Sequence, residues 1–170
     1  VHALPWIQAR VVWLAILSLF ALLMPSIPAQ AAKPFPVDQF SYYLSDYDYE
    51  LAKLAKDLKK TEAELLADIQ SAETAGNARL TAAAIEQLLT KRPTDSALWL
   101  KLAQQLAVST PINDSDGYQL PSKMIGAGLR AYTYAKTAPD EAAALLIAGQ
   151  GFAKRENWRP ALLAYKESLK

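Results

Sequence analysis

A helical spacing of apolar residues runs through most of this chain and limits what the chain can fold into. Leu51, Leu54, Ala55 and Leu58 follow the i, i+3, i+4, i+7 pattern of an amphipathic helix. Alanine and leucine, which are strong helix formers, supply much of the apolar content, while glycine is scarce with 6 residues. Strand-type runs of β-branched residues are nearly absent. The sequence therefore predicts an all-α fold.

Turn signals divide this pattern into several helices. Gly76 and Asn77 predict a helix end followed by a new N-cap, and Ser96 is expected to cap another helix after Pro93. Asn157 is expected to cap the last helix. The expected helices after the turn at Gly76 cover 78–90, 97–107, 122–136, 141–154 and 158–170, with a long loop over 109–121. Leu65, Leu66 and Ile69 continue the helical spacing, and the positions expected to face inward on the helix over 78–90 are Leu80, Ala84, Ile85, Leu88 and Leu89.

Two of the expected helix pairs carry matching packing positions. In one pair, the first helix carries an aromatic residue, apolar residues and a small residue at helical spacing. In the later pair, both helices carry residues of these kinds at corresponding positions. The positions are Trp99, Leu102, Ala103 and Leu106, and then Leu145, Gly149, Phe152, Ala161 and Tyr165. Small residues at such positions let two helix backbones approach closely. This pattern resembles the tetratricopeptide repeat, which implies antiparallel helix pairs stacked as a short solenoid, with a weaker unit over 65–89. A helical bundle without superhelical stacking is the alternative.

The first 31 residues have the features of a secretory signal peptide. Arg10 precedes a 14-residue apolar run over 11–24, Pro25 ends that run, and Ala29 and Ala31 supply the small residues that a signal peptidase reads. A membrane anchor is the alternative, but spanning the hydrocarbon takes about 20 residues. We expect cleavage after Ala31 and export to the periplasm or cell envelope of a bacterium.

The expected organisation is a signal peptide over 1–31, an irregular linker over 32–46 and a tetratricopeptide-like domain over 47–170. The last helix reaches Lys170 without a stop signal, which predicts a helical domain truncated at its C-terminal end. An aromatic cluster lies around the linker boundary, at Phe40, Tyr42, Tyr43, Tyr47 and Tyr49. The cluster is expected either to cap the first helix pair or to form a docking strip for a partner.

Residue types that carry most enzyme chemistry are missing after the predicted cleavage site. His2 is the only histidine of the chain, there is no cysteine, and residues 32–170 hold seventeen basic and seventeen acidic side chains. These facts exclude histidine-dependent triads and the usual zinc or haem ligands, and they give no electrostatic reason to bind nucleic acid. We therefore expect no enzymatic activity, cofactor or metal, and no stable membrane span once the signal is removed.

Two groups of acidic residues are candidate sites. Residues 113–117 read as a calcium loop only if Ile112 takes the first ligand position and Lys123 the twelfth, and neither residue suits Ca²⁺. A polar turn is therefore expected there. Glu64 and Asp68 lie one turn apart on a helix face, where the sequence predicts solvent exposure.

A longer segment allows a comparison with a known family. It comprises Tyr118, Leu120 and Pro121, then Ala131 and Tyr132, then 142–145, then 154–155 with 158–162, and then Tyr165, Lys166, Ser168 and Leu169. This segment resembles the helical N-terminal region of some bacterial alpha-2-macroglobulin proteins, which are exported endopeptidase inhibitors. The thioester, the bait region and the β-sandwich domains of that family have no counterpart here, so no inhibitory residue carries over.

Three functions are compatible with these observations. The first is a scaffold or interaction module at the N-terminal end of an alpha-2-macroglobulin-like inhibitor, whose partner is a protein, a peptide or downstream domains of the same polypeptide. The second is a free-standing periplasmic tetratricopeptide adaptor for peptides or envelope-assembly proteins. The third is an envelope enzyme whose catalytic domain lies downstream of residue 170.

Overall fold

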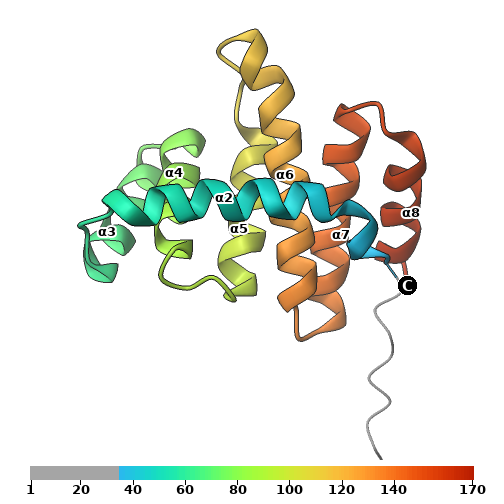
Figure 1. The fold of residues 1–170 in the computed structure, drawn as a ribbon, viewed down its shortest axis with the longest axis horizontal. Helices are drawn as coiled ribbons and strands as arrows, with labels where there is room; N and C mark the ends of the chain where they lie inside the picture. The colour runs from blue at the N-terminus through green and yellow to red at the C-terminus, as the bar shows by residue number, and fades with distance from the viewer. Residues whose placement is uncertain (1–34) are drawn as a thin grey trace, which may run out of the picture. The chain divides into compact units, whose positions relative to one another are not determined.

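The described part of the chain is entirely helical. The computed structural model describes residues 35–170, so the predicted signal peptide over 1–31 lies outside the described residues. Residues 35–170 form one 3₁₀ helix followed by seven α-helices, and no strand. Figure 1 shows their arrangement. Their bounds are η1 Val37–Phe40, α2 Ser41–Asp57, α3 Glu62–Thr74, α4 Ala78–Leu89, α5 Ser96–Val108, α6 Asp114–Tyr134, α7 Ala138–Lys154 and α8 Trp158–Ser168. The prediction of an all-α fold is confirmed.

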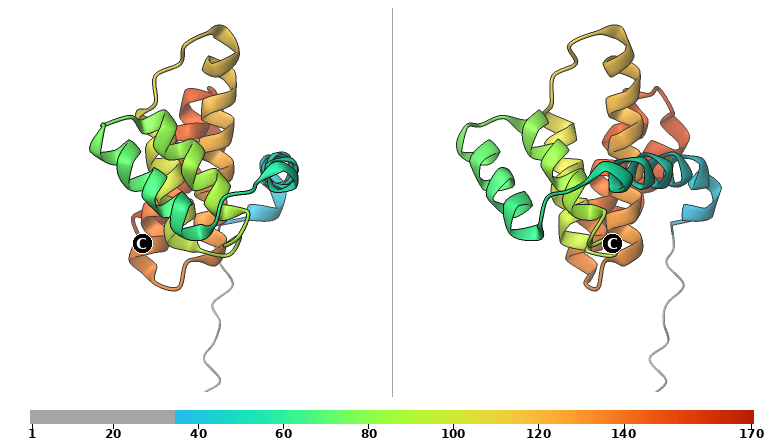
Figure 2. Two further views of the ribbon diagram at one scale, coloured as in Figure 1. Left: turned by 90° about the vertical axis from the view of Figure 1, so that its left-hand side faces the viewer. Right: turned by 60° about the vertical axis from the view of Figure 1, so that its left-hand side comes forward.

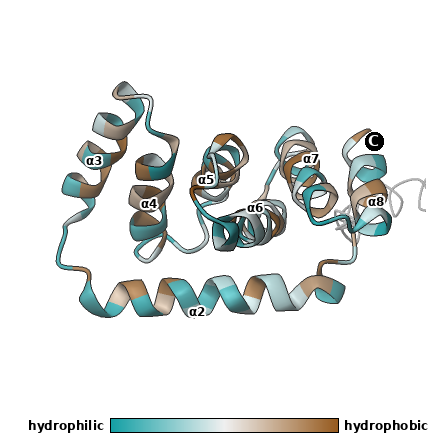
Figure 3. Cartoon of the chain, turned by 90° about the horizontal axis from the view of Figure 1, so that it is seen from above, coloured by the Kyte–Doolittle hydropathy of each residue, from teal (hydrophilic) through white to brown (hydrophobic). Residues whose placement is uncertain are grey.

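The six helices from α3 to α8 lie side by side in a row, and α2 crosses the row on one face. Each of the six packs against the next one along the chain, and α5 also contacts α7. Figure 3 views the row from above, with α3 to α8 side by side and α2 running along one side of the row, and the views in Figure 2 agree. α2 makes its largest contact with α6 and a smaller one with α4. None of the helices over 35–170 is both long and apolar enough to cross a membrane.

Local capping explains several helix starts. Thr61 caps α3 in a reciprocal box with Glu64, and Asn77 caps α4 through the N–H of Leu80. Gly76 has φ +64°, which is a left-handed conformation that glycine adopts without a Cβ penalty. The turn predicted at this glycine and the cap predicted at Asn77 are both confirmed.

Two other predicted caps differ from the structure. Asp95, and not Ser96, caps α5, because the Asp95 side chain accepts a hydrogen bond from the N–H of Leu98. Asn157 occupies the N-cap position of α8 without a capping hydrogen bond from its side chain. Its Nδ2 atom lies 3.4 Å from the hydroxyl oxygen of Tyr43 instead. A contact between distant helices has replaced a local cap.

The predicted linker over 32–46 is too long, because α2 begins at Ser41. The prolines that suggested irregular chain end at Pro36, and η1 lies between them and α2. Residues 41–46 have no strong helix propensity of their own. Their helix is stabilised by packing of Phe40, Tyr43 and Tyr47 against the later helices, and such packing outweighs local propensity.

The predicted loop over 109–121 is also too long, because α6 begins at Asp114. Asn113 caps this helix through the N–H of Asp116, and Asp114 and Asp116 place negative charge in its first turn, where the helix dipole favours it. Pro121 lies inside α6 and is buried. A proline there cannot donate to the carbonyl four residues earlier, which is why the sequence favoured a loop. The result is about two extra turns at the start of α6.

The predicted inward face is only partly buried. Leu51, Leu65 and Ile69 are buried, as are Ala84, Ile85, Leu88 and Leu89. The inward position predicted for Leu80 is wrong, because this side chain is exposed. The helical period predicted from Leu51 to Ile69 corresponds to α2 and α3, but Leu54, Ala55 and Leu66 are exposed in these helices, and Leu58 is only half-buried. α2 buries only Tyr47 and Leu51, and α3 packs mainly against α4, so parts of both apolar faces have nothing to cover them.

A candidate binding cleft between α2 and α6

The nine predicted repeat-packing positions lie on three helices of the row. Trp99, Leu102, Ala103 and Leu106 lie on α5, Leu145, Gly149 and Phe152 on α7, and Ala161 and Tyr165 on α8. All are buried except Tyr165, which is half-buried. They hold the row together and form no surface site.

Small residues mark the closest helix contacts. A Cβ atom built on Gly149 would lie 2.7 Å from Cε1 of Tyr165, so α7 and α8 meet where the sequence placed a small residue opposite an aromatic one. A Cβ atom on Gly128 of α6 would lie 3.0 Å from the backbone nitrogen of Ala148 in α7. A larger side chain at Gly128 would not fit at this spacing, and the close contact fixes the position of α6 relative to α7.

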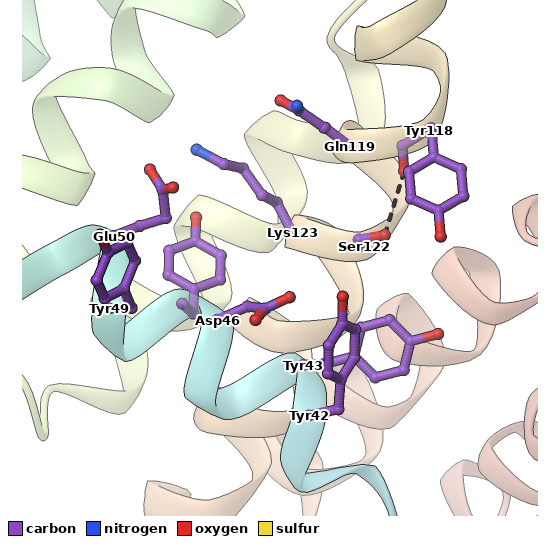
Figure 4. Close-up of a pocket in the computed structure, with 10 residues that line it drawn as sticks. Tyr42, Tyr43, Asp46, Tyr49, Glu50, Tyr118, Gln119, Ser122 and Lys123 are labelled. Atoms are coloured by element: carbon purple, nitrogen blue, oxygen red, sulfur yellow. Dashed lines mark hydrogen bonds between the residues drawn. The ribbon is translucent and has the colours of Figure 1, made fainter.

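A cleft of about 430 Å³ opens between α2 and the first half of α6. Its lining is rich in tyrosine and charged side chains (Figure 4). The α2 side supplies Tyr42, Tyr43, Asp46, Tyr47, Tyr49 and Glu50, and the α6 side supplies Tyr118, Gln119, Ser122 and Lys123. Tyr118 and Gln119 belong to the two extra turns of α6. Residues that were expected to form a loop therefore build part of one wall of the cleft.

A polar network joins two side chains at the floor of the cleft, Tyr47 and Lys123, to Glu86 in α4. The buried Tyr47 hydroxyl donates a 2.6 Å hydrogen bond to Oε1 of Glu86 in α4, and Lys123 Nζ lies 3.1 Å from the same oxygen. The Tyr47 ring meets the Trp99 ring edge-on, with 5.3 Å between centroids. Burial, followed by the nearby Glu86 carboxylate, raises the pKa of Tyr47 well above its ordinary value of 10.0. Each polar group of this network has a partner, so the network stabilises the floor of the cleft.

The rim of the cleft carries three exposed tyrosine rings. Tyr42 is 66%, Tyr49 72% and Tyr118 62% exposed. The Arg155 guanidinium lies 3.6 Å from the centroid of the Tyr118 ring, and its Nη1 atom donates a 2.5 Å hydrogen bond to the Ser122 hydroxyl. This stacking orders the Tyr118 ring although most of it faces solvent.

Two carboxylates lie among these rings on α2. A hydrogen bond to Asp46 and the negative charge of that carboxylate raise the pKa of Tyr42 above 10.0. Asp46 therefore lies close to the Tyr42 hydroxyl, and Glu50 lies one turn further along α2 (Figure 4). The cleft thus offers carboxylate oxygens that can accept hydrogen bonds, together with aromatic ring faces, and both are suited to binding a ligand. Across residues 35–170 no group of three or more histidine, cysteine, aspartate or glutamate side chains could hold a metal ion.

The aromatic cluster predicted at the start of the domain is divided by the structure. Phe40, Tyr43 and Tyr47 point inward, and their rings contact Phe152 and Trp99. These packing partners belong to α7 and α5, so the cluster does not simply cap the first helix pair. Tyr42 and Tyr49 remain exposed at the cleft. Sequence reasoning gave Tyr118 no role in a site and missed Glu86 and Lys123. The usable signal was the spacing of Tyr42, Asp46, Tyr49 and Glu50 on one helix face.

The acidic residues of the two candidate sites, in 113–117 and at Glu64 and Asp68, have structural roles. Asp116 pairs with Arg79 at 2.8 Å and accepts a hydrogen bond from the N–H of Ile112, which fixes the start of α6. Glu64 belongs to the α3 capping box, and Asp68 pairs with Lys60 at 2.6 Å. Each of these carboxylates has a partner within the domain.

Comparisons with known proteins give no family assignment. No protein-family model matches the chain, and neither curated proteins nor solved structures give a match.

Proposed function

We propose that this chain is an exported, non-catalytic helical scaffold that binds a protein or peptide partner in the cleft between α2 and α6. One observation carries the proposal: three tyrosine rings stand exposed around a cleft whose floor is fully paired. Tyrosine offers a large, rigid contact surface with a polar tip, and it dominates many protein-binding surfaces. A ring held in place before binding loses little conformational entropy when a partner arrives.

We also infer that α5–α6 and α7–α8 are tetratricopeptide-like units. The contact between Gly149 and Tyr165, and that between Gly128 and Ala148, support this inference. The long α6 is a departure from the repeat. Scaffolds of stacked helix pairs commonly bind partners through such added or altered surfaces.

Export is supported by the sequence of residues 1–31 alone. N-terminal sequencing of the protein recovered from a bacterial periplasm tests it. A mature terminus at Ala32 is the expected result, and membrane-bound protein with Val1 intact would contradict it.

Selection from a displayed library of random dodecapeptides tests the binding proposal. The purified protein is the bait, and binders are measured by fluorescence anisotropy. A variant with Tyr42, Tyr49 and Tyr118 changed to alanine should lose at least about tenfold in affinity, since each tyrosine anchor contributes roughly 1 kcal/mol or more.

A matched control variant distinguishes binding in the cleft from non-specific binding to exposed apolar side chains. Leu66, Leu80 and Val108 are exposed apolar side chains away from the cleft. Changing these three to alanine should leave the affinity unchanged. If no peptide is enriched, or if the control variant loses as much affinity as the tyrosine variant, the proposal is wrong.

A second candidate function is that of an N-terminal segment in an alpha-2-macroglobulin-like inhibitor. Its support is the resemblance described above and an exposed apolar pair within that segment. Trp158 is 61% and Leu162 68% exposed, and they lie one turn apart on α8. Such a pair suits packing by a neighbouring domain. Genomic sequence that continues in frame into β-sandwich domains would support this candidate, and a stop codon directly after Lys170 would exclude it.

A further inference from the structure

The solvent-facing side of α2 alternates aromatic and acidic residues along the cleft. Tyr42, Asp46, Tyr49 and Glu50 stand at positions i, i+4, i+7 and i+8, which share one helix face. All four side chains are exposed and all four line the cleft. Aromatic rings beside carboxylates form the surroundings in which proteins bind cationic groups, because the ring face and the carboxylate both attract positive charge.

The cations of the cleft are already engaged, but its carboxylates are not. Lys123 is neutralised by Glu86, and Arg155 is held by the Tyr118 ring and Ser122. Over residues 35–170 neither Asp46 nor Glu50 takes part in an ion pair. The neighbouring Tyr42 side chain is neutral, so it leaves the charge of Asp46 uncompensated. The cleft therefore presents two negative charges to any segment that enters it.

We propose that the cleft selects an extended peptide segment with arginine or lysine at alternate positions. This inference rests on the proposed function and names its partner. Asp46 and Glu50 are four residues apart, which separates them by about 6 Å along the helix axis. In an extended peptide, side chains on the same side of the backbone recur about every 7 Å. Two basic side chains at positions i and i+2 thus match the two carboxylates.

The flanking rings favour the same side chains. Tyr42 lies beside Asp46 and Tyr49 beside Glu50, so each basic side chain meets one carboxylate and one aromatic face (Figure 4). Arginine suits such a site best, since its planar guanidinium pairs with a carboxylate and stacks on a ring at once. The exposed position of the carboxylates predicts an affinity that falls as salt is added.

Defined peptides test this inference by isothermal titration or fluorescence anisotropy. The probe is acetyl-Gly-Ser-Arg-Ser-Arg-Ser-Gly-amide, and the comparison peptide has glutamine in place of both arginines. The arginine peptide should bind about tenfold or more tightly, because glutamine loses both the ion pair and the ring contact. A peptide with the two arginines adjacent should bind more weakly than the probe.

Charge-neutral variants of the protein identify the carboxylates. Asp46→Asn together with Glu50→Gln should weaken the arginine peptide by roughly fivefold, which corresponds to two partly exposed ion pairs. Asp38→Asn together with Asp57→Asn removes the same charge from exposed positions outside the cleft and should change little. Equal binding of the glutamine peptide, or an equal loss in both double variants, would overturn the inference.

Failure of this inference can be told apart from failure of the proposed function. If the library yields peptides that need the three tyrosines but contain no basic residues, the selectivity for basic peptides is wrong and the binding function stands. If neither the library nor the arginine peptide binds, both are wrong.

Discussion

The backbone of Gly149 in α7 lies directly against the ring of Tyr165 in α8. A Cβ atom at residue 149 would lie 2.7 Å from Cε1 and 2.8 Å from Cδ1 of that ring, well inside van der Waals contact. The two helices therefore approach each other at a distance that only glycine permits at this point.

Changing Gly149 to alanine should destabilise the fold by about 1–3 kcal/mol, since the added methyl group must displace the ring. Urea unfolding followed by circular dichroism measures the loss. Gly117 is the matched control, because a Cβ atom there meets no atom within 4 Å. Gly117→Ala in α6 should be neutral or slightly stabilising. An equal loss in both variants would show that the Tyr165 contact is not the cause.

The position of α2 depends on Gly126 in α6. A Cβ atom at Gly126 would lie 2.8 Å from the backbone oxygen of Tyr43 and 2.9 Å from Cδ2 of Tyr47. A backbone atom cannot swing aside, so Gly126→Ala should push α2 away from α6 and cost about 2 kcal/mol or more. Displacement of Tyr47 from Trp99 should also shift the tryptophan emission to longer wavelength. Unchanged emission with unchanged stability would contradict this packing.

The hydrogen bond between Tyr47 and Glu86 should contribute to stability. Tyr47→Phe keeps the ring on Trp99 but removes the donor to the largely buried carboxylate, which should cost about 1–2 kcal/mol at neutral pH. Lys123 remains to pair with Glu86 and limits the loss. Urea unfolding measures the difference, and Tyr49→Phe, at an exposed tyrosine of the same helix, should have little effect.

Ionisation of the Tyr47 hydroxyl should make the free energy of unfolding depend on pH. The pKa of Tyr47 is raised in the folded state above the value of 10.0 that it has when exposed. The unfolded chain therefore loses this proton first, and the stability that the group contributes is complete below pH 10 and lost as pH rises towards the folded pKa. The free energy of unfolding should fall less steeply above pH 10 in Tyr47→Phe than in the wild type. Identical slopes would show that the hydroxyl titrates normally.

Asp116 should control the order of the first turns of α6. The hydrogen bond from the N–H of Ile112, together with the Arg79 guanidinium, lowers the pKa of Asp116 below its ordinary 3.8. The stabilising charge is thus fully present above that value and is lost as pH falls through the lowered pKa. Asp116→Asn should speed amide hydrogen exchange over 114–121 and weaken peptide binding, because Tyr118 lies on these turns. Asp114→Asn, at an exposed position of the same turn, should have a smaller effect.

Much of the helical framework could be predicted from local sequence. The helix end near Gly76 and the helix start at Asn77 follow from left-handed backbone geometry and capping, which act within a few residues. The cleft was not predicted as a whole, since its walls come from α2 and α6, which are distant in sequence. Tyr42 and Tyr49 were recognised as part of an aromatic cluster, but the sequence could not show which tyrosines face solvent.

The sequence by itself determined that the described chain is helical, where most helices begin, and that Gly149 and other small residues allow close packing. Hydrophobic period, caps and glycine geometry are local properties, and they do not need the rest of the fold. Only the tertiary structure decided that 41–46 and 114–121 are helical and that α2 crosses the row to form a tyrosine cleft. Those segments have weak local preferences or carry a proline, so their conformation depends on contacts with Trp99, Phe152 and Arg79, which are distant in sequence.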